Sequence, residues 1–595
     1  MRKAEKDYIA DYISQYKTEA KKMWSLINDK LGRNSHNSTL PEMCEGEEKA
    51  LANKFNDFFT NVGPKLAESI TNKGDPLAHL GKAYEQSMYT KPVTEKELLH
   101  LISELKNSSA GIDSIKASVI KAVKDELMSP MLYLLNQSLR DGIFPDALKV
   151  AVVTPIYKKG CKNTLSNYRP VSVLTTFSKL FEKIMNNRIV EYLEKFSILY
   201  ENQYGFRKGY STDLALSTVI DFVMKELEDN KTVCGIYMDL SKAFDTINHT
   251  VLKQKLKHYG INGPAYQWIA SYLQNRKQVV SINNTYSDPS FLKCGVPQGS
   301  ILGPTLFLIY VNDIYRVSHL MNFVLFADDT NVFKSGDNIN TVINCVNSEL
   351  VKVSKWFRTN QLTLNISKTH FMIFSRRYIP SVTNVCIDNI QLERVKCTTF
   401  LGVHIDDMIS WKQHISHVLN KVNRGIGILY KLRNVFPKQT LLQIYKSLIY
   451  PHLNYCNIIW GNCYQNIISE LYKAQKRALK VALKMPIRTP TELVFNTAKV
   501  LTLAGINRTH TSIFMYKYHN NLLPNTFVNK FHQVRDVHSY SLRSSQLYVI
   551  PMAKSKLYKT SLQHRAPKLW NMLPTELKQS LSLTSFKINV KKFFL

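Results

Sequence analysis

The fold is decided by a short segment in the middle of the chain, NFVLFADDTNVF at residues 322–333. Its two apolar runs predict two adjacent β-strands, with Asp328 and Asp329 at the turn between them. Upstream, the segment TVCGIYMD at residues 232–239 predicts a buried strand that ends in Asp239. Carboxylates at the tip of an apolar hairpin repel one another and lose solvation when a site closes around them, so they need a cation.

If these two segments meet, the three carboxylates form an oxygen-rich site suited to Mg²⁺, with Mn²⁺ as a substitute. Two such ions, about 3.5–4 Å apart, stabilise the attacking and leaving oxygens of an in-line phosphoryl transfer. The alternative is a plain polar turn between two strands. For an isolated Asp-Asp pair that alternative is favoured, so the neighbouring sequence has to decide.

Three motifs in the order and spacing of one family favour the metal site. Motif A of reverse transcriptases resembles YMDLSKAFDTIN at residues 237–248, and motif C resembles FVLFADD at residues 323–329. Motif B, in the form found in LINE elements and group II introns, resembles GVPQGSILGP at residues 295–304. The resemblance runs from about residue 148 to residue 403 and is typical of jockey-like non-LTR retrotransposons. It implies an RNA-directed DNA polymerase with a right-hand α+β fold of fingers, a palm with an antiparallel sheet, and a helical thumb.

The resemblance assigns the metal ligands and a residue that selects the sugar. Asp239, Asp328 and the backbone carbonyl of Leu240 would hold the ions, with Asp329 supporting the pair. Phe244 would place its ring against the 2′ side of the incoming sugar, where RNA-dependent RNA polymerases favour an aspartate that binds the 2′-hydroxyl. A ring offers bulk without an acceptor, so it should exclude ribonucleotides. The alternative is that Phe244 only anchors a helix in the core.

Four further residues are expected to bind substrate. The glycine-rich segment around Gly299 lets the backbone approach a ligand closely, and Gln298 would lie against the nascent base pair or the template. Lys158 and Arg169 are candidates for a clamp on the triphosphate, since Arg grips phosphate bidentately and Lys acts as a mobile point charge. The alternative for a single lysine such as Lys158 is a solvated surface charge.

Three other segments also match the family. Motif D resembles NQLTLNISKT at residues 360–369, where Lys368 would protonate the departing pyrophosphate as a general acid. The alternative for Lys368 is an ordinary exposed lysine. The segment QYGFR at residues 203–207 is expected to contact the template, and TFLGV at residues 399–403 resembles a primer grip.

The chain divides into five expected regions. They are a helical lead-in and linker (1–90), fingers (91–231), palm (232–405), helical thumb (406–485) and a basic C-terminal nucleic-acid-binding region (486–595). Lys and Arg number 78 against 46 Asp and Glu, a net charge of +32, and residues 431–595 carry 25 basic and 4 acidic residues. Such a basic segment with interleaved aromatic residues suits a nucleic-acid partner, although a basic soluble surface is the simpler alternative.

Composition excludes several other classes. Nine scattered cysteines without disulfide-like spacing fit a reducing interior, nuclear or cytoplasmic. The pairs His414–His417 and Cys456–Cys463 lack companions at ligand spacing, so no zinc is expected. The longest apolar runs fall far short of the roughly 20 residues that cross a bilayer, so no membrane partner is expected.

The expected partners are an RNA template, a DNA primer or target, and dNTPs. The roughly 90 residues before the expected fingers are too few for the endonuclease of an intact element, which points to a copy that lacks it. Two other functions stay open. One is a catalytically decayed or co-opted RNA-binding protein, and the other is an RNA-dependent RNA polymerase, against which Phe244 and the FADD hairpin count.

Overall fold

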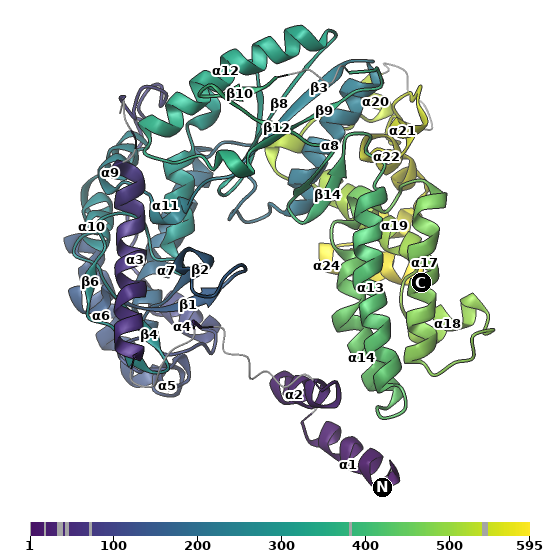
Figure 1. Ribbon diagram of the computed structural model, residues 1–595, viewed down its shortest axis with the longest axis horizontal. Helices are drawn as coiled ribbons and strands as arrows, with labels where there is room; N and C mark the ends of the chain where they lie inside the picture. Colours follow the sequence, from purple (N-terminus) through teal and green to yellow (C-terminus); the bar gives the residue numbers. More distant parts are fainter. Residues whose placement is uncertain are drawn as a thin grey trace.

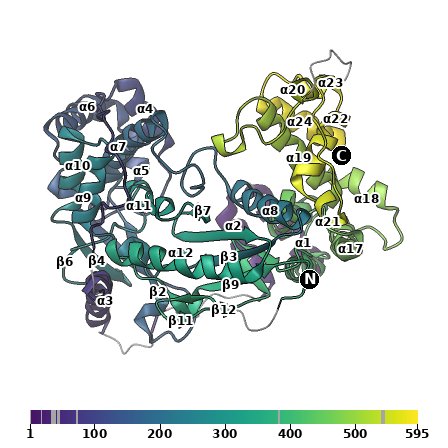
Figure 2. The ribbon, with the colours of Figure 1, turned by 90° about the horizontal axis from the view of Figure 1, so that it is seen from above.

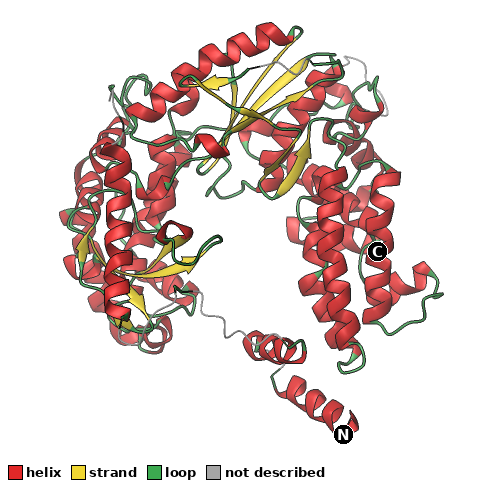
Figure 3. Cartoon of the chain, in the orientation of Figure 1, coloured by secondary structure: helices red, strands yellow, loops and turns green. Residues whose placement is uncertain are grey.

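A computed structural model describes residues 2–16, 19–32, 40–41, 47–68, 70, 74–379, 384–537 and 545–595. It has the predicted mixed α+β character, and Figure 1 shows the chain as an arch. The strands lie mainly in two five-stranded sheets, one in an arm of the arch and one across its top, while helices form the other arm (Figure 3). Within the expected lead-in and linker, the polar stretch at residues 34–39 lies outside the described residues.

The first sheet lies in one arm. It contains β1 (Val150–Tyr157), β2 (Tyr168–Val173), β4 (Lys277–Ile282), β5 (Thr285–Tyr286) and β6 (Ser290–Phe291). Strand β1 pairs antiparallel with β2 and parallel with β4. Helix α3 (Glu48–Glu68) covers this sheet, because Phe55 and Phe59 pack into one buried cluster with Val153 and Tyr168.

The second sheet crosses the top of the arch in the order β12-β9-β3-β8-β7. Its strands are β3 (Thr232–Met238), β7 (Asn322–Phe326), β8 (Asp329–Gly336), β9 (His370–Phe374) and β12 (Glu393–Arg394). Every residue of β3 is buried because helices cover both faces of the sheet. Val233 and Tyr237 join the cluster of α8 (Thr212–Glu228), whereas the alternating Cys234 and Ile236 join that of α12 (Ile339–Thr359).

The remaining helices and strands surround these two sheets. In the arm of the first sheet they are α4 (Glu95–Glu104), α5 (Ala117–Ala122), α6 (Lys124–Asp141), α7 (Thr176–Lys195), α9 (His249–His258), α10 (Gly263–Leu273) and α11 (Leu302–Val311). Two short hairpins are β10 (Cys386–Ile387) with β11 (Ile390–Gln391), and β13 (Cys397–Phe400) with β14 (Val403–Asp406). The N-terminal segment forms α1 (Arg2–Gln15) and α2 (Ala20–Lys30), as a helical lead-in predicts.

The helical arm begins after residue 406, close to the predicted boundary. Its helices are α13 (Lys412–Leu432), α14 (Lys438–Leu448), α15 (Tyr450–Asn454), α16 (Asn457–Trp460), α17 (Gln465–Ala482), α18 (Thr491–Ala498), α19 (Leu503–His519), α20 (Val534–Val537), α21 (Lys556–Lys559), α22 (Leu562–Met572), α23 (Thr575–Lys578) and α24 (Leu583–Phe594). Seen from above, α19, α22 and α24 lie on the opposite side of the molecule from α4 and α6 (Figure 2). No helix in the described ranges is both long and apolar enough to cross a membrane.

Two predicted region boundaries do not follow the sheets. The boundary at residue 231 separates β1 and β2 from β4, although Val150 to Val153 pair directly with Lys277 to Val280. The boundary at residue 90 separates α3 from the sheet that it covers. Both contacts join segments far apart in the chain, so local composition carries no signal for them.

Candidate active site

The second sheet brings the three predicted carboxylates together. Strand β3 runs antiparallel to β8, and Met238 lies opposite Thr330, so the next residue, Asp239, lies beside the turn between β7 and β8. Phe326 pairs with Asp329 across that turn, which therefore consists of Ala327 and Asp328. The two distant segments thus meet as the sequence predicts, with Asp329 at the start of β8.

The turn is strained and is braced from behind. Ala327 has a φ of 56°, in the left-handed region that residues other than glycine rarely adopt. Its N–H donates to Oε1 of Gln203 at 3.0 Å, and Tyr204 N–H donates to Leu325 O at 2.8 Å. A Cβ on Gly205 would lie 2.3 Å from Ala327 N, so only glycine fits there.

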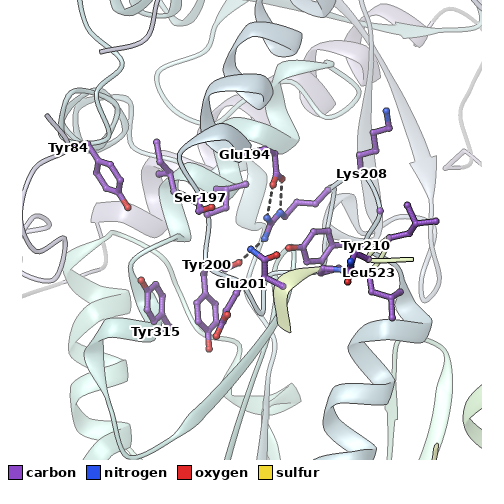
Figure 4. A pocket seen from close by; sticks show the side chains of 17 residues that line it. Tyr84, Glu194, Ser197, Tyr200, Glu201, Lys208, Tyr210, Tyr315 and Leu523 are labelled. Atoms are coloured by element: carbon purple, nitrogen blue, oxygen red, sulfur yellow. Dashed lines mark hydrogen bonds and ion pairs between the residues drawn. The ribbon is translucent and has the colours of Figure 1, made fainter. Parts of the chain in front are cut away.

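The QYGFR segment is predicted to contact the template, but its first residues support the hairpin instead. Gln203 and Tyr204 are buried against the hairpin, at 2% and 1% exposure, rather than open to a template. Arg207 forms a two-pronged ion pair with Glu194 and also donates to Tyr200 O, which fixes the turn that carries Gln203 (Figure 4). Glu194, Tyr200 and Arg207 line a pocket of about 620 Å³. The signal that the sequence offered was the glycine, which marks a close approach of backbone.

The carboxylate cluster holds more negative charge than it can balance alone. Burial raises the pKa of Asp329 to about 6, with further contributions from Asp328 and Asp239. Burial also raises the pKa of Asp328, and Asp239 adds to that rise while Arg169 opposes it. A divalent cation would relieve both effects, and carboxylate oxygens are the ligands that Mg²⁺ and Mn²⁺ prefer, so these residues fit such an ion.

Lys368 occupies part of this cluster. Its Nζ lies 2.9 Å from Oδ2 of Asp239, and its side chain is 58% exposed. Among the residues that the structure describes, no three His, Cys, Asp or Glu side chains are arranged around one point to hold a metal ion. Lys368 thus balances part of the charge of Asp239 in this structure, and its exposed side chain has room to move. Next to Asp239, Leu240 is fixed by a bridge to Leu364.

The two basic residues predicted as a triphosphate clamp lie at adjoining ends of β1 and β2 in the first sheet. Lys158 follows β1, and its N–H donates to Asn167 O at 2.9 Å, which sets it beside Arg169 on β2. Burial lowers the pKa of Lys158, and so do Arg169 and Lys368, whereas Asp239 raises it. Arg169 also opposes the rise in the pKa of Asp328, so both predicted clamp residues act electrostatically on the carboxylates.

Phe244 lies on the 3₁₀ turn Ala243–Asp245, five residues after Asp239. Its ring centroid is 4.8 Å from that of Phe307 and 6.2 Å from that of Phe206, and its backbone oxygen accepts from Val296 N–H. The ring is half-buried and packs against the core cluster. Anchoring in the core and a ring edge presented to the sugar are therefore compatible.

Gln298 and Gly299 form the turn before α11. Gly299 has a φ of 121°, and a Cβ there would lie 2.6 Å from Ser172 O, so this turn docks on the end of β2 through glycine. Gln298 O accepts from Ser172 N–H at 2.7 Å, while its side-chain Nε2 lies 2.8 and 3.0 Å from the two carboxylate oxygens of Asp245.

Two neighbours of the site, Asp245 and Lys242, carry no role in the sequence predictions. Lys242 has a φ of 52°, and burial lowers the pKa of its ammonium although Asp245 opposes this. Both residues lie inside the motif A segment, which was the available signal.

Residues 156–405 match the family model described as Reverse transcriptase (RNA-dependent DNA polymerase). The chain contains a reverse transcriptase domain. All of the predicted catalytic, metal-binding and substrate-binding residues lie within the matched segment. Helix α3 and the helices from α13 onward lie outside it.

The reverse transcriptase domain and its flanks resemble polymerases of insect transposons. The chain is 26% identical to a probable RNA-directed DNA polymerase from transposon BS of Drosophila melanogaster, over 75% of this chain and 50% of that protein. It is 27% identical to a probable RNA-directed DNA polymerase from transposon X-element of the same species, over 72% and 48%. It is 26% identical to the RNA-directed DNA polymerase from mobile element jockey of Drosophila funebris, over 67% and 44%. The chain spans about half the length of these relatives.

Proposed function

We propose that this protein is an RNA-directed DNA polymerase of a non-LTR retroelement, which extends a DNA primer on an RNA template with dNTPs. One observation carries the proposal: within a reverse transcriptase domain, the β3–β8 register sets Asp239 beside the turn that carries Asp328 and Asp329. A polar turn without a catalytic role would not require Asp239 beside Asp328 and Asp329.

The chain's two arms and sheet suit a right-hand polymerase. The second sheet with α8 and α12 serves as the palm, and the first sheet with α3 and its surrounding helices serves as the fingers. Helices α13, α14 and α17 serve as the thumb, and the basic residues 486–595 contact nucleic acid. In this arrangement residues 277–291 belong to the fingers although they lie inside the predicted palm segment.

Each site residue then has one task. Asp239, Asp328 and the Leu240 carbonyl are the groups that would hold Mg²⁺ or Mn²⁺, which when bound activates the primer 3′-hydroxyl and neutralises the triphosphate. Asp329 supports Asp328. Lys158 and Arg169 grip the triphosphate and draw it toward the carboxylates.

The remaining residues act on the sugar and the leaving group. Phe244 excludes a 2′-hydroxyl by bulk. Lys368, once it leaves Asp239, donates a proton to pyrophosphate as it departs. Gln298 and Gly299 hold the nascent base pair or the template.

Primer extension on an RNA template with Mg²⁺ and dNTPs tests the proposal. Asp328→Ala should reduce extension by at least about a hundredfold, since even residues one step removed from a metal are worth about 10- to 100-fold. Binding of RNA should remain and should weaken with salt, because it depends on phosphate contacts elsewhere. Asp337→Ala, at the far end of the β8 hairpin, is the matched control.

Two outcomes would contradict the proposal. Equal extension by Asp328→Ala and the parent would remove the metal mechanism. Incorporation of rNTPs in preference to dNTPs would favour an RNA polymerase instead.

A further inference from the structure

A second carboxylate of motif A serves the motif B turn rather than the catalytic cluster. Asp245 follows Asp239 by six residues, yet both of its carboxylate oxygens face Nε2 of Gln298, at 2.8 and 3.0 Å. The same turn is tied to Asp245 through the backbone, because Cys294 Sγ donates to Asp245 O at 3.3 Å. Asp245 therefore constrains the orientation in which the Gln298 amide can contact the substrate.

The pair is partly buried between α3 and the motif B segment. A Cβ on Gly63 of α3 would lie 2.1 Å from Asp245 O, and a Cβ on Gly295 would lie 2.8 Å from it, so the backbones of α3 and the turn press directly on this residue. The carboxylate adjoins a cavity of about 20 Å³, room for about one water. With so little solvent, the Gln298 amide is the main partner that compensates the buried charge.

The ionisable groups around Asp245 are few. Lys242 lies on its own turn and favours the ionised form. Cys294 faces it from the motif B segment, and burial raises the pKa of that thiol to about 11, so it stays neutral. Helix α3 contributes Phe59 and Thr60 and β2 contributes Pro170 to the adjoining cavity, none of which titrates. Burial raises the pKa of Asp245 to about 6, although the Gln298 hydrogen bond and Lys242 oppose that rise.

The chemistry of the two groups dictates how the amide is oriented. An ionised carboxylate can only accept hydrogen bonds, so Gln298 must turn Nε2 toward Asp245 and leave Oε1, an acceptor, for the substrate. A protonated Asp245 can donate instead, and the amide can then turn over and present Nε2 to the substrate. Ionisation of one buried residue thus selects between an acceptor and a donor at the polymerase site.

We propose that Asp245 is the positioning residue of Gln298, holding its amide so that Oε1 accepts a hydrogen bond from the incoming nucleotide or its base pair. The proposal rests on the polymerase function above and names one determinant of nucleotide binding within it. Asp245 touches no reacting atom, so its effect should appear in nucleotide binding rather than in the chemical step.

Asp245→Asn tests this directly, because it keeps the shape but can satisfy either amide orientation. At pH 8 the KM for dNTPs should rise by about three- to tenfold, the worth of one hydrogen bond, with kcat nearly unchanged. In the parent, KM should rise more steeply as pH falls through about 6 than in Asp245→Asn, whose remaining pH dependence comes from the carboxylate cluster of Asp328 and Asp329. Gln298→Met leaves Asp245 in place and should lose the same pH dependence.

A second measurement is independent of activity. With ¹⁵N-glutamine labelling, the side-chain amide signal that Gln298→Met removes should shift with an inflection near pH 6. The inflection should be absent in Asp245→Asn and present in the matched control Asp337→Asn, with melting temperatures showing that each variant folds.

The outcomes separate the two proposals. A parent enzyme that fails to extend primers while the Gln298 signal titrates would remove the polymerase function and keep the positioning. An active parent without that inflection, or an Asp245→Asn enzyme with the parental pH profile of KM, would overturn the positioning role.

Discussion

At the scale of single residues, Asp329 has a pKa raised to about 6 by burial and by its two acidic neighbours. Because its folded pKa lies above the unfolded value, ionised Asp329 costs stability, and this cost is present above pH 6 and disappears as pH falls below about 4. Asp329→Asn should therefore increase the unfolding free energy of the metal-free protein at pH 7.5 by on the order of 1 kcal/mol and so raise its melting temperature. At pH 4 the melting temperature should be unchanged.

The same charge balance predicts how metal acts on stability. Mg²⁺ compensates the ionised cluster, so it should raise the melting temperature of the parent more at pH 7.5 than at pH 5. Asp329→Asn should lose most of that increase, together with primer extension. Thermal melts with Mg²⁺ and with EDTA measure this, and an equal effect of Mg²⁺ on parent and variant would contradict it.

At the scale of elements, the sequence could predict β3, β7 and β8 because alternating and continuous apolar runs end at the acids. It could not predict what holds the turn, because Gln203 and Gly205 reach Ala327 from a segment more than a hundred residues away. Roles assigned from family motifs likewise named Gln298 but not its partner Asp245. Motif spacing identifies the residues that members of the family share, whereas hydrogen bonds between motifs can be seen only in the folded structure.

Gly205→Ala tests the brace behind the hairpin. The added Cβ would meet the backbone of Ala327 at 2.3 Å, and backbone cannot move aside as a side chain can. The expected cost is about 1–3 kcal/mol of stability, with a larger loss of primer extension because the turn carries Asp328. Gly427→Ala on α13, where a Cβ meets nothing within 4 Å, should be neutral or slightly stabilising. Matching losses of stability and activity in both variants would argue against a specific brace.

At the scale of the whole molecule, the linear division into regions was predictable only where a region is continuous in sequence. The helical arm after residue 406 is continuous in sequence, because its helices pack mainly on one another, as α13 does on α17 and α19 on α24. The arm with the first sheet is not continuous in sequence, since β1 pairs in parallel with β4 and is covered in part by α3. Parallel pairing needs a long crossover, and here that crossover contains α7, α8 and β3.

The last region is docked on α8 by a buried ion pair and by hydrogen bonds to a carboxylate. Asp221 on α8 is paired with Lys530 at 2.5 Å, and Glu228 at the end of α8 accepts hydrogen bonds from Arg376 and from Ser555. Burial alone would raise the pKa of Glu228, but these hydrogen bonds lower it to about 2. The last region should therefore move with α8 as one body.

Glu228→Gln tests that docking. A carboxyl with a depressed folded pKa stabilises the protein above its unfolded pKa, and this contribution is lost as pH falls through about 2. At pH 7 the variant should lose about 2–3 kcal/mol from the free energy of unfolding and become sensitive to proteolysis after residue 530. The difference between variant and parent should shrink as pH falls from 4.5 toward 2. Glu201→Gln, at an exposed glutamate, is the control. A stability difference that does not change over this pH range would mean that the Glu228 charge does not hold the C-terminal region in place.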